Sequence, residues 1–94
     1  MNLEQFIEAL DQKRTIYYQR TFPTLTAPKL VMTQGKKYAK IYEPKGGVYC
    51  FVDLTNGDIL KAAGWSKPAK HARGNINDPD PTAKCGPYGP EYLR

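Results

Sequence analysis

The sequence is poor in the residues that hold metal ions and covalent cross-links. Its 94 residues include two cysteines, Cys50 and Cys85, and one histidine, His71. These three residues lack the ligand spacing of a zinc site, and two cysteines are too few for a disulfide framework. A Cys50–Cys85 bridge is one option, and a strand cysteine that packs as a small apolar residue is the favoured one. Since no phosphate-loop glycine pattern is present either, we expect no metal and no cofactor.

Long apolar runs are also missing, and we expect no amino-terminal leader. The longest apolar stretches have a handful of residues, whereas a helix that crosses a bilayer needs about 20. Residues 1–12 carry acids where a secretory signal would carry lysines. We therefore expect no membrane partner and a cytoplasmic location. A chain of this length forms one domain with a small core, which argues against a deep enzyme cleft between two lobes.

Acidic residues are absent between Asp58 and Asp78, and this gap holds four cations and the histidine. The whole chain has 14 Lys and Arg residues against 9 Asp and Glu residues, a formal net charge of +5. Positive charge gathered in one short segment favours a polyanionic partner such as nucleic acid. The excess is modest and does not by itself identify the anion.

Helical periodicity is confined to the first twenty residues. Asn2 is a good N-cap, and Gln5 can complete a capping box with it. Pro23 prevents the helix from continuing, so we expect it to span about Leu3 to about Arg20. Its apolar stripe consists of Leu3, Phe6, Ile7, Leu10 and Tyr17.

Turn residues then separate four short segments rich in β-branched and aromatic residues. This pattern predicts a four-stranded antiparallel meander and an α+β fold with the helix packed on the sheet. Residues 67–73 are expected to form a basic loop with about one helical turn, with Pro68 near its start and Gly74 as its left-handed stop. The expected strands are Lys29–Gln34, Lys37–Glu43, Val48–Asp53 and Asp58–Ala62.

Periodicity is lost after residue 76. Residues 77–94 contain four prolines and two glycines. Such a composition cannot build a core and predicts an extended C-terminal arm. We therefore expect a domain over residues 1–76 and an arm over residues 77–94.

Strand alternation is expected to place aromatic and basic side chains on the face of the sheet away from the helix. Bases of single-stranded nucleic acid stack on such rings, while lysines neutralise phosphates. The alternative is that the tyrosines only pack across strands, as they commonly do on half-exposed sheets. The residues of this face are Tyr38, Lys40, Tyr42, Tyr49 and Phe51.

Trp65 and the acid-free segment form a second candidate site. Short-loop cations and the N–H groups of a helical turn would bind a phosphate, whereas in the alternative Trp65 anchors the core and the cations are a solvated rim. His71 has no nucleophile or carboxylate at motif spacing, and turn capping explains Asp53 and Asp58, so we expect no enzyme. The cations and the histidine are Lys61, Lys67, Lys70, His71 and Arg73.

The run from Phe51 to Ile76 resembles a signature of small uncharacterised proteins of tailed bacteriophages. The signature combines an aromatic-Val-Asp strand with Gly-Asp-Ile, Lys-x-Ala-x-Trp, Pro-Ala-Lys and Arg-Gly-Asn. Here these motifs begin at Phe51, Gly57, Lys61, Pro68 and Arg73. The resemblance covers about a quarter of the chain. It implies a phage origin, and no activity is attached to it.

We expect a non-enzymatic nucleic-acid-binding protein, single-strand selective with weak sequence preference, that acts in phage DNA metabolism. The alternative is a small phage interaction protein, either a virion or assembly component or an inhibitor of a host protein. It would bind a protein partner or a second copy through residues 77–94. In the first reading Tyr38, Tyr42, Tyr49 and Trp65 stack, and Lys40, Lys61, Lys67, Lys70, His71 and Arg73 contact phosphate.

Overall fold

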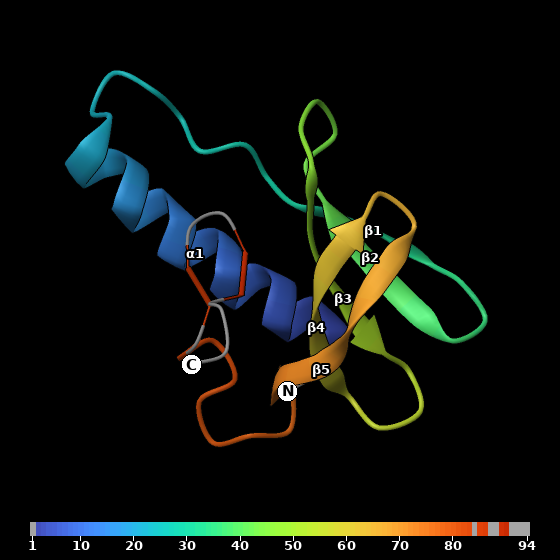
Figure 1. The fold of residues 1–94 in the computed structure, drawn as a ribbon. Helices are drawn as coiled ribbons and strands as arrows, with labels where there is room; N and C mark the ends of the chain where they lie inside the picture. Colours follow the sequence, from blue (N-terminus) through green and yellow to red (C-terminus); the bar gives the residue numbers. More distant parts are fainter. Residues whose placement is uncertain (1, 84, 87–88, 91–94) are drawn as a thin grey trace.

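One helix packs on a five-stranded antiparallel sheet (Figure 1). This computed structural model describes residues 2–83, 85–86 and 89–90. The strands lie in chain order, β1-β2-β3-β4-β5, so the sheet is a simple meander. The expected α+β class is confirmed, with one strand more than the four expected. The elements are α1 Leu3–Thr21, β1 Val31–Gln34, β2 Tyr38–Tyr42, β3 Val48–Asp53, β4 Asp58–Gly64 and β5 Lys67–Asn75.

The capping box predicted for α1 is present. The N–H of Gln5 donates to Oδ1 of Asn2 at 2.8 Å, and the N–H of Asn2 donates to Oε1 of Gln5 at 3.1 Å. At the other end the N–H of Phe22 donates to the carbonyl of Tyr18 at 2.7 Å. Both ends therefore satisfy backbone groups that a helix leaves unpaired.

The buried row of α1 contains an arginine. The buried side of α1 carries Phe6, Leu10 and Arg14, which follow one another at intervals of four residues. The Arg14 side chain is only 1% exposed. The predicted apolar stripe holds for its first half, since Leu3 and Ile7 pack against the core. Its last member, Tyr17, is half-buried, and its ring packs instead against those of Tyr18 and Phe22.

Arg14 joins four parts of the fold. Its Nη1 donates to the carbonyl of Pro28 at 2.7 Å, and its Nη2 forms an ion pair with Glu43, which directly follows β2. Its guanidinium carbon lies 6.0 Å from the ring centroid of Tyr49 on β3. A buried guanidinium is tolerated only when its donors are satisfied, so these contacts fix the helix relative to the connector, β2 and β3.

A bulge moves Tyr49 to the helix side of the sheet. The β2–β3 register pairs Ile41 with Cys50 and Tyr42 with Val48, which leaves Tyr49 as an extra residue. Tyr49 is 4% exposed and lies in the core cluster together with Cys50. Its expected position on the outer aromatic face was wrong, because strict alternation of side chains fails across a bulge.

The segment expected to be a basic loop is strand β5. It pairs antiparallel with β4, with register shifts at three places. The composition was misinterpreted because an edge strand needs ladder donors on one side only and therefore tolerates Pro68. Gly74 has no left-handed φ and lies opposite Ile59 in the ladder, so the expected helical turn and its stop were both wrong.

The described residues of the arm pack on the domain. Nζ of Lys13 on α1 donates to the carbonyls of Thr82 at 2.5 Å and Cys85 at 3.2 Å. The hydroxyl of Tyr49 donates to the carbonyl of Gly86 at 2.5 Å. Cys85 belongs to the core cluster, so the expectation that this segment adds nothing to the core was wrong there. The boundary at residues 76 and 77 stays a prediction.

Cys50 and Cys85 are not joined by a disulfide, and both are buried in the same cluster. This is the packing role favoured above for Cys50. Within the described ranges, α1 lacks the apolar run that a membrane crossing requires.

The Arg14–Glu43 pair predicts which of two substitutions destabilises the protein more. Glu43→Ala leaves a buried guanidinium without its carboxylate and should lower the free energy of unfolding by about 3 kcal/mol. Arg14→Met replaces the buried charge with an apolar side chain, and the Glu43 carboxylate, which is 26% exposed, can then be hydrated. This variant should therefore lower the free energy of unfolding by less than Glu43→Ala does. Urea unfolding of both variants, with the exposed Glu8→Ala as control, measures the order. A larger loss for Arg14→Met would contradict this account.

Tyr49 gives a prediction for alkaline pH. Burial, with the nearby Cys85 and Cys50 thiols, raises the pKa of the Tyr49 phenol well above its ordinary value of 10.0. The native state then keeps a proton that the unfolded chain loses, so stability is full below pH 10 and falls as the pH rises above it. Tyr49→Phe should cost about 1 kcal/mol at neutral pH through the lost hydrogen bond to Gly86. Its unfolding free energy should also fall less steeply above pH 10, and a curve parallel to the wild type would refute the assignment.

Candidate nucleic-acid interface

The outer face of the sheet, defined as the face opposite α1, is only partly the one expected. Lys40 on β2 pairs with Phe51 on β3, which pairs with Leu60 on β4. The neighbouring residues Ala39 and Ile41 are fully buried on the helix side. Alternation therefore holds through the middle of β2 and β3, and it places Lys40 and Phe51 on the outer face. The expectation that Phe51 is uncovered there was wrong, because its side chain is only 4% exposed.

Three of the predicted residues meet on this face in what we call the Trp65 cluster: Lys40, Tyr42 and Trp65. The Trp65 ring centroid lies 5.7 Å from that of Tyr42 in an edge-on arrangement. Nζ of Lys40 lies 3.6 Å from the Trp65 ring centroid and 5.6 Å from that of Tyr42. Because β3 separates β2 from β4, these contacts require the β4–β5 hairpin to curl toward β2 (Figure 1).

Trp65 is not a core residue. It is 56% exposed at the tip of the β4–β5 hairpin, where Gly64 pairs with Lys67. A tryptophan that anchors a small core would be buried, so the alternative in which Trp65 is a packing anchor is wrong. The ring is instead supported from the sheet by a lysine and a tyrosine, with more than half of its surface open to solvent.

A shallow groove of about 270 Å³ lies beside this ring. Trp65 is the one member of the Trp65 cluster that lines it. Small residues make up most of the groove, so a flat ligand can approach the backbone closely. The lining residues are Gly47, Val48, Ala62, Ala63, Gly64 and Trp65. The Ala-Ala-Gly run was not among the predicted site residues, although three small residues before a tryptophan are a visible signal.

The cations of β5 extend from the same hairpin. Lys67 is exposed directly after the turn. Lys70 and His71 are exposed in an irregular part of the ladder, where the five residues of β5 from Pro68 to Ala72 lie opposite the three residues of β4 from Leu60 to Ala62. Arg73 is half-buried further along the strand. The ladder thus presents three of the predicted cationic and histidine side chains to solvent beyond Trp65.

The remaining predicted residues lie elsewhere. Tyr38 is half-buried at the start of β2, with its ring 6.2 Å from that of Phe51 and 5.3 Å from Nζ of Lys37. Nζ of Lys61 donates to the carbonyl of Pro90 at 3.2 Å, so this lysine holds the arm. Tyr49 is buried in the core and cannot stack with a base.

The acids of the β3–β4 turn have structural partners. Hydrogen bonds from the hydroxyl and the N–H of Thr55 lower the pKa of the Asp53 carboxyl. Oδ1 of Asp58 accepts a hydrogen bond from Nδ2 of Asn75 at 3.0 Å. These contacts fit turn capping, as expected, rather than a pair of catalytic carboxylates.

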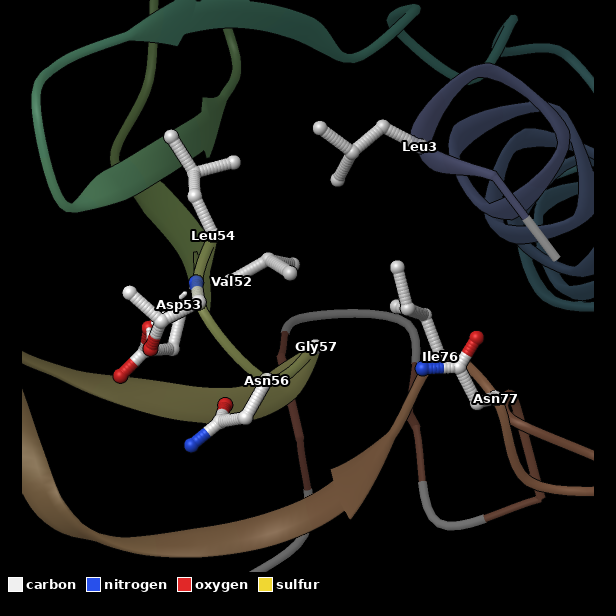
Figure 2. A pocket seen from close by; sticks show the side chains of 9 residues that line it. Leu3, Val52, Asp53, Leu54, Asn56, Gly57, Ile76 and Asn77 are labelled. Atoms are coloured by element: carbon white, nitrogen blue, oxygen red, sulfur yellow. Dashed lines mark hydrogen bonds between the residues drawn. The ribbon is translucent and has the colours of Figure 1, made fainter.

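A second hollow, of about 290 Å³, lies between the start of α1 and the β3–β4 turn (Figure 2). Its walls are mainly apolar, and its polar rim includes the capping residue Asp53 and two asparagines. Among the residues that the structure describes, His, Cys, Asp and Glu do not gather in threes around a possible metal position. Its labelled lining consists of Leu3, Val52, Asp53, Leu54, Asn56, Gly57, Ile76 and Asn77.

Comparisons with known proteins identify a family but no activity. A search of curated proteins and a search of solved structures each found no match. One family model matches residues 2–87 and carries the description "family of unknown function". The match includes α1, all five strands and the run from Phe51 to Ile76. The chain therefore belongs to this family of unknown function, DUF7717.

Proposed function

We propose that this protein binds single-stranded nucleic acid on the outer face of its sheet and catalyses no reaction. The observation that carries the proposal is the Trp65 cluster, in which an exposed indole is supported from the sheet beside an open groove. Stacking on an exposed aromatic ring contributes about 1–3 kcal/mol per base in single-strand binding proteins. In keeping with the phage resemblance, we propose phage DNA metabolism in the host cytoplasm as the setting.

The charges around the cluster support an anionic ligand. Nζ of Lys40 lies against the Trp65 ring, so a base stacked on the open side of the ring would have its phosphate near positive charge. Lys67 follows the hairpin, and Lys70 and His71 follow within one short stretch of β5. Lys67 and Lys70 are three residues apart on β5, so each can contact a different phosphate.

The form of the site favours a single strand. Bases in a duplex are already stacked and present only their edges, whereas unpaired bases offer a face to an aromatic ring. The groove beside Trp65 is shallow and contains no deep pocket for a particular base edge, which fits weak sequence preference.

We do not base a second function on the arm. Its described residues are held to the domain by Lys13, Tyr49 and Lys61, and Cys85 is part of the core. A segment that the domain uses for its own packing is a weaker candidate for an independent binding element than the exposed Trp65 cluster.

Removing the stacking ring should weaken binding. Trp65→Ala is expected to reduce affinity for a labelled oligothymidylate by about 5- to 150-fold, which corresponds to 1–3 kcal/mol. Trp65 is the only tryptophan, so quenching of its fluorescence during the titration reports stacking directly in the wild type. Phe22→Ala, which removes an exposed ring at the far end of α1, is the matched control and should bind as the wild type does. Equal affinities for all three proteins would exclude Trp65 as a stacking residue.

The lysines of β5 should determine the salt dependence. For single strands the logarithm of the affinity falls by about 0.7 per phosphate contact for each unit in the logarithm of salt concentration. Lys67→Gln and Lys70→Gln should each reduce this slope by about 0.7. Arg20→Gln, at the exposed end of α1, removes the same charge away from the site and should leave the slope unchanged. An unchanged slope in both lysine variants would show that these residues of β5 do not contact phosphate.

A further inference from the structure

The two edges of the sheet differ in how they are protected. β5 carries Pro68, two lysines and several register shifts, which are features that prevent a further strand from pairing. β1, at the opposite edge, is Val-Met-Thr-Gln, with neither a proline nor a charge, and its register with β2 is regular over all four residues. In the described chain no other strand pairs with its outer side.

The outward backbone groups of β1 can be assigned from the hairpin. The N–H of Gly35 donates to the carbonyl of Tyr38 at 2.9 Å, which closes the β1–β2 turn. Bonded and non-bonded pairs alternate in an antiparallel ladder, so Thr33 and Val31 bond to β2. Met32 and Gln34 therefore direct their N–H and carbonyl groups away from the sheet.

The helix shields this edge only at its beginning. The N–H of Leu30, which has the same outward direction, donates to Oδ1 of Asp11 on α1 at 3.0 Å. The structure shows no corresponding contact for the backbone of Met32 or Gln34 among the described residues. Val31 and Thr33 are exposed beside them. The outward backbone groups of Met32 and Gln34 are therefore available to pair with one added strand of about four residues.

The charges at the two ends of β1 argue against a second copy as the added strand. Lys29 precedes β1, and Lys36 and Lys37 follow it. In the symmetric antiparallel register that overlaps the two β1 strands fully, Met32 of one copy pairs with Gln34 of the other, so Lys29 of each copy approaches Lys36 and Lys37 of the other. Like charges in such positions disfavour pairing, whereas acidic side chains at both ends of an incoming strand would be complementary.

We propose that the edge of β1 binds an extended segment of a partner protein, added as a sixth strand. The segment is uncharged over about four residues and has acidic residues at both ends. Main-chain hydrogen bonds to Met32 and Gln34 provide affinity, as in other cases of strand addition, and the flanking lysines select the acidic ends. β1 adjoins the Trp65 cluster, since Thr33 pairs with Lys40 and Val31 pairs with Tyr42, but the backbone groups proposed here point away from β2. The proposal does not depend on nucleic-acid binding.

A pair of variants at Gln34 tests the backbone contact. The probe is the peptide Glu-Glu-Val-Thr-Val-Thr-Glu-Glu with blocked ends, titrated into the ¹⁵N-labelled protein and followed by amide chemical shifts. Gln34→Pro removes an outward donor and adds a ring at the edge, and it should weaken binding by about tenfold or more. Gln34→Ala keeps the donor and should bind as the wild type does. Shifts centred on Met32 and Gln34, lost in the proline variant alone, would support the proposal.

Charge reversal supplies a second test that does not rely on the proline variant folding. The variant Lys29→Glu with Lys36→Glu should bind the Glu-ended peptide more weakly than a Lys-ended peptide with the same centre, whereas the wild type should show the opposite order. Oligothymidylate affinity, measured in parallel on the Gln34 variants, should not change. Absence of peptide shifts at β1, equal binding by both Gln34 variants, or dimerisation of the wild type through β1 would overturn the proposal.

Discussion

The fold depends on one buried guanidinium. Arg14 is 1% exposed, and it satisfies its charge with Glu43 and the carbonyl of Pro28 while its planar group lies over the Tyr49 ring. An unpaired charge at this depth would be too costly to bury, so the connector and the end of β2 have to approach the helix here. The same contacts hold the bulge of β3 inward. Tyr49 then bonds Gly86, so the helix, the sheet and the arm share one set of contacts.

The candidate site arises from irregular strand pairing rather than from a flat aromatic sheet. The bulge removes Tyr49 from the outer face, and the register shifts between β4 and β5 accompany the curl of their hairpin. This curl brings Trp65 to Tyr42, although β3 lies between their strands in the sheet. The outer face therefore carries one localised cluster with a groove beside it, where alternation alone would predict a row of rings.

Local features could be predicted from the sequence because they depend on neighbouring residues. The capping box, the helix bounds to within one residue and the limits of β3 all agree with the structure. Features that depend on contacts between distant parts of the chain could not be predicted from the sequence. Arg14 occupies a core position that a polarity pattern assigns to solvent, and the Pro68–Gly74 segment has a composition shared by loops and edge strands. Lys40, Tyr42 and Trp65 were each identified as candidates, but their meeting depends on the curl of the sheet.

The packing of the two cysteines has a consequence for chemical reactivity. Cys50 lies beneath α1 in the same cluster as Cys85, and burial raises the pKa of the Cys50 thiol. A soluble alkylating reagent needs both physical access and a thiolate, and the closed fold restricts both at this site. Alkylation of Cys50 must therefore wait for a local opening of the packing around it. The rate of Cys50 alkylation under native conditions therefore measures how often the packing around Cys50 opens, and this measurement does not require unfolding the protein.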